Sequence, residues 1–176
     1  MTISEAAGEP AGCEGQSDDL WRFSCAFYAQ PGVSEALLAL QDRAGLDVNL
    51  ILFALWRGAC GLRRLSQAEL MAAERSAGPV TAAIVLPLRA LRRKLRSDRD
   101  ADIQRLRERI KALEIAAERM VQRRLAHLAG APASDTAPAA RAAVAQANLE
   151  LVLGPKMAGA VEATRIREAL EAFLRG

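Results

Sequence analysis

Four arginines are the residues of this sequence best placed to do chemistry on an anionic partner. They are Arg89, Arg92, Arg93 and Arg96. Positions i, i+3, i+4 and i+7 share one face of a helix, so the four guanidinium groups could follow a row of phosphates. No aromatic residue is interleaved to stack on bases, and a run of aspartates follows at once. We therefore favour the alternative, which is a solvated arginine face or one paired with the acidic N-terminal third.

A second polar group lies on the most apolar stretch of the chain. Asp47 and Asn49 precede the uninterrupted apolar run from Leu50 to Trp56, and Arg57 follows it. These three residues could form a polar site beside a pocket for a small molecule or substrate. Arg57 is ten residues beyond Asp47, so the two could meet only through another helix. We favour a simple helix cap at Asp47, and a bond from its carboxylate to residues 49–50 would exclude the ligand site.

The sequence contains none of the patterns that mark a catalytic or cofactor site. It has no phosphate-binding loop, no dinucleotide-type glycine pattern and no GxSxG. His127 is the only histidine and has no acidic or cysteine neighbour one helical turn away. The alternating aspartates 98, 100 and 102 lack the glycine and the distal glutamate of a calcium loop. We expect a non-enzymatic protein with no metal and no cofactor.

The charge of the chain is divided unevenly between two regions. Residues 1–60 carry three arginines and eight acidic residues, whereas residues 86–124 carry thirteen basic and six acidic residues. The remaining residues leave a net charge of only +3. An acidic first third and a basic middle indicate either internal pairing or a basic surface for an anionic partner.

The elements that must position these residues are helical. Alanine and leucine dominate a sequence that is 51% hydrophobic and 4% aromatic, which is typical of all-α proteins. The helix over residues 46–60 is apolar on every side and should be buried at the centre of the fold. Ser66 and Glu69 have the spacing of a capping box that begins the next helix. A stripe over residues 84–95 should be buried: Ile84, Val85, Leu88, Leu91 and Leu95.

The longest helix should run over residues 98–129, from a capping box at residues 97–100. Its apolar residues step by three and four along a heptad seam: Ile103, Leu106, Ile110, Leu113, Ala117 and Met120. Beyond Met120 the stripe shifts to Val121, Leu125 and Leu128. The seam is long enough for a helical hairpin and marginal for an independent coiled coil.

The domain organisation follows from these elements. We expect a disordered tail over 1–16, a helical core over 17–129, a flexible linker over 130–138 and a C-terminal helical hairpin over 139–176. The predicted fold is an irregular all-α bundle around the buried central helix, with the C-terminal pair as an accessory lobe.

Several short motifs resemble a family of small helical proteobacterial proteins known as a domain of unknown function. The motifs are Phe27-Tyr28, Pro31-Gly32-Val33, Leu40-Gln41-Asp42, Asp47-Val48-Asn49 and Pro87-Leu88-Arg89. The resemblance covers roughly residues 20–96. It implies an all-helical cytoplasmic protein whose signature includes Asp47 and Asn49, and it implies no activity, substrate or cofactor.

We predict an interaction or adaptor protein that acts through the arginine face or the heptad stripe over 103–128. Its partner would be another protein or a second copy in a homodimer. One alternative is a nucleic-acid-associated protein that uses the same arginines; another is a small-molecule binder or enzyme with its site near Asp47 and Asn49. No secretory leader or membrane span is visible in the sequence, so we expect a cytoplasmic protein without a membrane partner.

Overall fold

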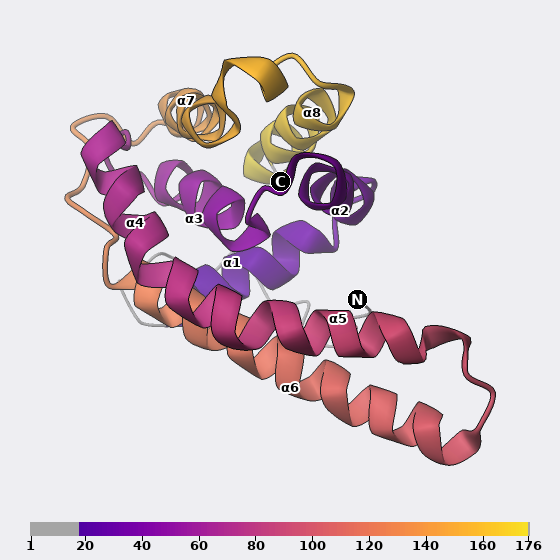
Figure 1. Ribbon diagram of the computed structural model, residues 1–176. Coiled ribbons are helices and arrows are strands. Elements are labelled where there is room, and N and C mark those ends of the chain that lie inside the picture. The colour runs from indigo at the N-terminus through magenta and orange to yellow at the C-terminus, as the bar shows by residue number, and fades with distance from the viewer. Residues whose placement is uncertain (1–17, 176) are drawn as a thin grey trace.

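The protein is an all-α bundle, as the composition predicted. The structure, a computed structural model, describes residues 18–175, so the expected tail over 1–16 lies outside the described residues. The elements are α1 (Asp19–Tyr28), α2 (Val33–Ala44), α3 (Val48–Ala59), α4 (Gln67–Val80), the π-helix η1 (Thr81–Val85), α5 (Leu86–Lys94), the 3₁₀-helix η2 (Leu95–Ser97), α6 (Ala101–Ala126), α7 (Pro138–Met157) and α8 (Val161–Arg175). Figure 1 shows the helices packed around α3, with α5 and α6 extending side by side from the body.

The central helix α3 is buried on every side, which confirms the prediction from its apolar run. All its residues from Asn49 to Ala59 are buried. Its side chains contribute to two hydrophobic clusters. Ile51, Leu52 and Leu55 join the cluster that includes α1, α2, α7 and α8, and Phe53, Ala54 and Trp56 join the cluster that includes α4 and α6. The helix therefore connects the two halves of the core.

The C-terminal helices α7 and α8 belong to the core and are not an accessory lobe. A Cβ atom on Gly58 would lie 2.2 Å from the backbone nitrogen of Ala145, so α7 approaches α3 as closely as a glycine allows. The Asn148 side chain donates to the carbonyl of Ala54 and accepts from the amide of Leu65, at 3.1 and 2.8 Å. The linker of small residues and prolines over 130–138 predicts an accessory lobe, and the small residue Gly58 in α3 gives no apolar signal of a partner helix to correct it.

Residues between α6 and α7 run alongside the segment that follows α3. The amide of Arg63 donates to Ala131, and the amide of Ala133 donates to Gly61. An isolated bridge joins Leu62 to Pro132, and no strand occurs over residues 18–175. These bonds fix the path of the expected linker at its start.

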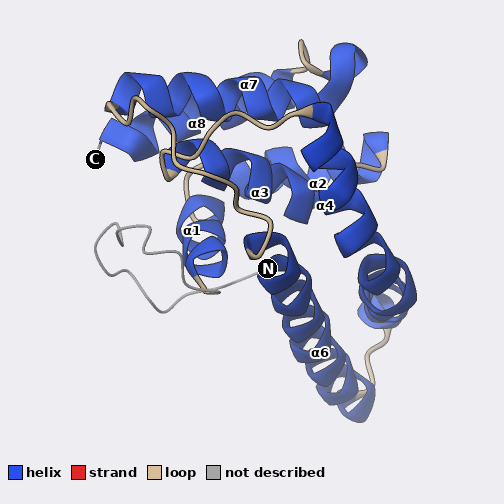
Figure 2. Ribbon diagram, turned by 90° about the vertical axis from the view of Figure 1, so that its left-hand side faces the viewer, coloured by secondary structure: helices blue, strands red, loops and turns tan. Residues whose placement is uncertain are grey.

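The α5–α6 hairpin is the most extended part of the molecule. α4, η1 and α5 follow one another without an intervening loop, the path bends between α4 and α5, and α6 returns antiparallel to α5 (Figure 1). Figure 2 shows the N-terminal half of α6 reaching beyond the other helices. α6 begins at Ala101 and not at residue 98, because the Asp100 carboxylate caps the amides of Asp102 and Ile103. The capping box expected at residues 97–100 is therefore replaced by a single aspartate cap.

Candidate interaction site on the α5–α6 hairpin

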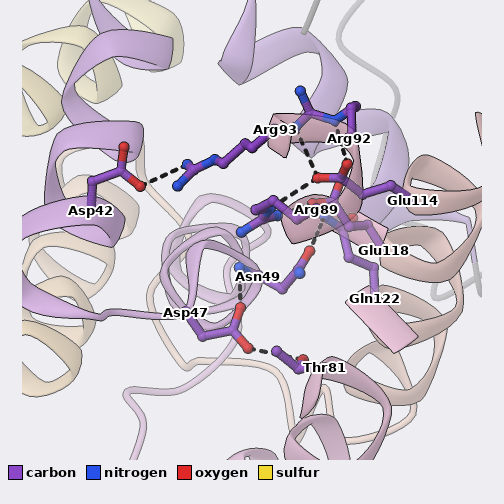
Figure 3. A network of polar contacts seen from close by, with 10 residues as sticks. All are labelled: Asp42, Asp47, Asn49, Thr81, Arg89, Arg92, Arg93, Glu114, Glu118 and Gln122. Atoms are coloured by element: carbon purple, nitrogen blue, oxygen red, sulfur yellow. Dashed lines mark hydrogen bonds and ion pairs between the residues drawn. The ribbon is translucent and has the colours of Figure 1, made fainter. Parts of the chain in front are cut away.

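Two of the four predicted arginines are held between the helices of the hairpin. Arg89 donates from Nε to Glu114 Oε1 at 2.9 Å and from Nη2 to Glu118 Oε1 at 2.5 Å. Arg92 donates from Nε and Nη2 to the two carboxylate oxygens of Glu114. Figure 3 shows both guanidinium groups turned toward these carboxylates of α6. Glu114 thus receives both arginines and is itself 5% exposed.

The other two arginines do not continue this arrangement. Arg93 donates to Asp42 of α2 at 2.8 Å, in an ion pair that is half exposed on both sides (Figure 3). Arg96 is exposed and has no ion pair within residues 18–175. The structure therefore does not bring the four arginines together as one exposed basic face. Within residues 18–175, Arg93 is the member of the four that pairs with an acid of the N-terminal third, and farther along the basic middle Arg119 and Arg123 pair with Asp18.

The two glutamates of this network differ in protonation behaviour. Burial favours the neutral form of Glu114, but the hydrogen bonds from Arg92 and Arg89 outweigh burial and lower its pKa. Burial dominates at Glu118 and raises its pKa, although Arg89 lies beside it. Burial and the nearby Glu118 also raise the pKa of Tyr28 to about 12. Charge is therefore concentrated at Glu114 and disfavoured around Glu118.

Asp47 and Asn49 connect the start of α3 to the hairpin. Asp47 accepts from the amide of Asn49 at 2.8 Å through Oδ1, and from the hydroxyl of Thr81 at 3.1 Å through Oδ2. The Asn49 side chain accepts from Gln122 of α6 at 2.9 Å (Figure 3). The cap bond that would argue against a ligand site is present. Both residues have structural partners that fix α3 against η1 and α6.

Arg57 lies near the other end of α3 and is not part of this cluster. Its side chain is 1% exposed. It donates to the carboxylate of Glu69 at 3.1 Å and to the carbonyl oxygens of Arg63 and Leu128 at 3.0 and 3.4 Å. Glu69 also completes the capping box with Ser66, as predicted. Arg57 therefore joins the end of α3 to the start of α4 and the end of α6.

The heptad seam of α6 is only partly buried. Ile110 and Ala117 are each 5% exposed, and the buried face continues through Val121 and Leu125. The three seam residues spaced seven apart remain exposed, at 50% for Leu106, 58% for Leu113 and 46% for Met120. These three residues form a line along α6, because seven residues are nearly two whole turns.

The apolar stripe expected over residues 84–95 is likewise largely unburied. Val85 is buried, whereas Ile84 and Leu91 are exposed. Leu88 and Leu95 are half-buried. The prediction that this stripe is buried is wrong because, among residues 18–175, α6 alone packs along most of the length of α5 (Figure 1). Its polar residues Arg89 and Arg92 take part of the surface facing that partner.

The hairpin therefore has two sides of opposite character. The inner side carries Arg89, Arg92, Glu114 and Glu118, and the bonds of Arg93 and Gln122 connect it to α2 and α3. When each helix is viewed along its axis from its N-terminus, Leu91 is rotated by about 160° from Arg89 and Leu113 by about 100° from Glu114, both in the same direction. Because the two helices are antiparallel, rotation in the same direction brings both leucines to the same side of the hairpin. Leu91 and the line on α6 thus form an outer side, defined here as Leu91, Leu106, Leu113 and Met120.

Sequence reasoning did not find Glu114, Glu118, Gln122 or Thr81. A signal was available for the two glutamates, which are four residues apart on α6 and so face α5 together. Predicting which arginine meets which glutamate also requires knowing how α5 and α6 are aligned. The paired residues are 22–29 positions apart in the sequence. Nothing in the local sequence fixes that alignment.

These contacts define an all-helical protein with a buried central helix and a helical hairpin that combines buried ion pairs and apolar contacts on its inner side with exposed apolar residues on its outer side. The chain belongs to the family described as protein of unknown function (DUF2390), whose family model matches residues 19–125. The match covers the helices from α1 to nearly the end of α6, including the hairpin. It confirms the resemblance that the short motifs indicated. No curated protein and no solved structure matches the chain.

Neither a membrane-crossing helix nor a metal-binding cluster occurs in the part of the chain that the structure describes. Over residues 18–175 no helix combines the length and the apolar character that a membrane crossing requires. Within the same residues no three His, Cys, Asp or Glu side chains are grouped to hold a metal ion.

Proposed function

We propose that this protein is a non-enzymatic interaction protein that binds a protein partner through the outer side of the α5–α6 hairpin. Of the two surfaces that the sequence suggested, the heptad stripe is the better supported. The arginine face is less well supported because three of its members have carboxylate partners.

One observation carries the proposal. Leu106, Leu113 and Met120 are each about half exposed along one line of α6, the helix whose N-terminal half reaches beyond the other helices (Figure 2). A single exposed leucine is ordinary, whereas an ordered line of large apolar side chains marks an interaction site. Leu91 of α5 extends the same surface. Covering these side chains would remove apolar area from water and so favour association.

The nucleic-acid alternative has less support. Phosphate binding requires guanidinium groups that are not already neutralised, and Arg89 and Arg92 bind the same buried carboxylate of Glu114. The small-molecule alternative is weakened by the cap bond of Asp47 and by the distance of Arg57 along α3. We further propose the cytoplasm as the compartment, which the motif resemblance implies.

The test is a pair of matched methionine variants. Met120 on the outer side and Met71 on α4 are both 46% exposed, so Met120→Glu and Met71→Glu place the same charge at equally exposed sites. The tagged full-length protein is used to capture partners from nuclease-treated lysate of its native cell. We expect Met120→Glu to lose a discrete protein that the wild type and Met71→Glu retain. Identical captures by all three proteins, or a capture that nuclease abolishes, would overturn the proposal.

A further inference from the structure

We infer that the outer side of the hairpin receives an amphipathic α-helix of the partner whose apolar stripe is flanked by acidic residues. This inference rests on the proposed function and specifies the partner's docking element. It is carried by the spacing of the apolar residues and by the charge around them.

The spacing matches the packing requirements of a third helix. Leu106, Leu113 and Met120 repeat every seven residues, which is the repeat of helices that pack side by side at a small angle. They extend over about 21 Å of α6, so two heptads of a partner helix would cover them. Leu91 on α5 supplies a contact from the second helix. Side chains of a third helix could pack between the apolar residues of two antiparallel helices in the same way as in the core of a helical bundle.

The charge around these residues is basic on balance, because the one acid a helical turn from the line, Asp102 before Leu106, is paired with Arg105. One helical turn beyond an apolar residue lies Lys94 after Leu91, Arg109 after Leu106, and Arg124 after Met120. All three basic side chains are exposed, and none has an ion pair in the part of the chain that the structure describes.

A partner helix with glutamate or aspartate beside its apolar stripe would pair with this rim. Rim charges of this kind add more to the choice of partner and to the association rate than to total affinity. Charge complementarity therefore indicates that the partner segment is acidic, and the heptad spacing of the apolar line indicates that it is an amphipathic helix.

The same charges argue against a second copy of this chain. A symmetric dimer through the outer side would place two identical basic rims in one interface, where like charges repel. An anionic membrane surface also attracts basic amphipathic helices, but such helices typically anchor with tryptophan or phenylalanine. Residues 80–126 contain no aromatic residue. The observations therefore favour an acidic helix, and the other occupants become outcomes of the test.

The experiment uses two designed peptides and the full-length protein. Each peptide has about 21 residues, with leucine at the a and d positions of three heptads. One has glutamate at the e and g positions and the other has lysine there, so each peptide repels its own copies. Binding is measured by fluorescence anisotropy at low and high salt. We expect the glutamate peptide to bind at least about tenfold more tightly than the lysine peptide, with a difference that shrinks as salt is added.

Matched variants assign the effect to the rim and the stripe. The double variant Arg109→Glu, Arg124→Glu should reverse the preference between the peptides, whereas Arg96→Glu, an exposed arginine away from the outer side, should leave it unchanged. Met120→Glu should abolish binding and Met71→Glu should not. Circular dichroism and urea unfolding of each variant establish that all are folded.

Several results would overturn the inference. These are equal binding of both peptides, dimerisation in sedimentation equilibrium that Leu113→Glu abolishes, or binding to phosphatidylcholine vesicles containing phosphatidylserine that Met120→Glu abolishes. If Met120→Glu removes a captured protein from lysate but the peptides bind equally, the proposed function stands and the acidic helix is wrong. If Met120→Glu changes neither capture nor peptide binding, both are wrong.

Discussion

The two sides of the α5–α6 hairpin use their residues in opposite ways. On the inner side, Arg89 and Arg92 could have been solvent-exposed, yet they are tied to the buried carboxylate of Glu114. On the outer side, Leu106 and Leu113 could have been buried, yet they face solvent. Ion pairs thus join the two helices beside the buried apolar residues Ile110 and Ala117, while other apolar residues remain exposed. A heptad stripe on a hairpin therefore does not by itself show which of its residues hold the fold and which are available for binding.

Substitutions on the inner side should therefore alter the free energy of unfolding, and substitutions on the outer side should alter partner binding. The largest effect on stability is expected from Glu114→Gln. The amide cannot neutralise two arginines that are mostly buried, and removing one partner from a buried ionic group costs about 3 kcal/mol. Urea unfolding measures the loss. Partner capture by the folded variant should be unchanged, and a loss of less than about 0.5 kcal/mol would contradict the role given to Glu114.

A smaller loss is expected where α3 meets α6. Asn49→Ala leaves the buried amide of Gln122 without the acceptor that it now has. An unsatisfied buried donor costs about 1–3 kcal/mol, so the variant should unfold at lower urea. The double variant Asn49→Ala, Gln122→Ala is the control, because it removes both partners. A double-mutant cycle showing no coupling between the two sites would contradict the contact.

Glu118→Gln should change stability least on the inner side, and its effect should depend on pH. Burial raises the pKa of Glu118 in the folded protein, so its stabilising contribution is present below its ordinary value of 4.5 and is lost as pH rises through the raised value. At neutral pH the variant should lie within about 1 kcal/mol of wild type or above it.

The contribution of Glu114 to stability depends on pH in the opposite direction. Its pKa is lowered in the folded protein, so its contribution is present above 4.5 and is lost as pH falls through the lowered value. Urea midpoints of wild type, Glu118→Gln and Glu114→Gln between acidic and neutral pH measure both slopes. A larger loss at neutral pH in Glu118→Gln than in Glu114→Gln would reverse the assignment.

The smallest effect on stability is expected from Leu113→Glu on the outer side. Leu113 is 58% exposed, so a charged side chain there keeps most of its hydration and should change the free energy of unfolding by less than about 0.5 kcal/mol. Urea unfolding beside Glu114→Gln measures the contrast. A loss as large as that of Glu114→Gln would show that the outer side contributes to the core.

The sequence was sufficient for features that depend on local pattern. The burial of α3 follows from seven consecutive apolar residues, and the caps at Asp47 and Ser66 follow from residue type and spacing. Features that depend on packing between distant segments were not accessible. The position of α7 in the core depends on Gly58, whose missing side chain admits Ala145 but leaves no apolar pattern to read.

The candidate site shows the same division. The arginines and the heptad seam were found by periodicity, which places residues on a face of a helix but does not say what that face contacts. Which face of α5 meets α6 is decided by how the two helices of the hairpin are rotated about their axes and aligned along them. That arrangement places Arg89 and Arg92 on the inner side and leaves half of the seam residues of α6 exposed.

We propose that the outer side binds a partner and contributes little to the stability of the fold. The most direct test is to measure urea unfolding and partner capture together for wild type, Met120→Glu and Met71→Glu. We expect three nearly identical unfolding curves and a captured protein that is missing from Met120→Glu alone. Equal capture by all three proteins, or a Met120→Glu variant whose capture fails because it unfolds, would contradict it.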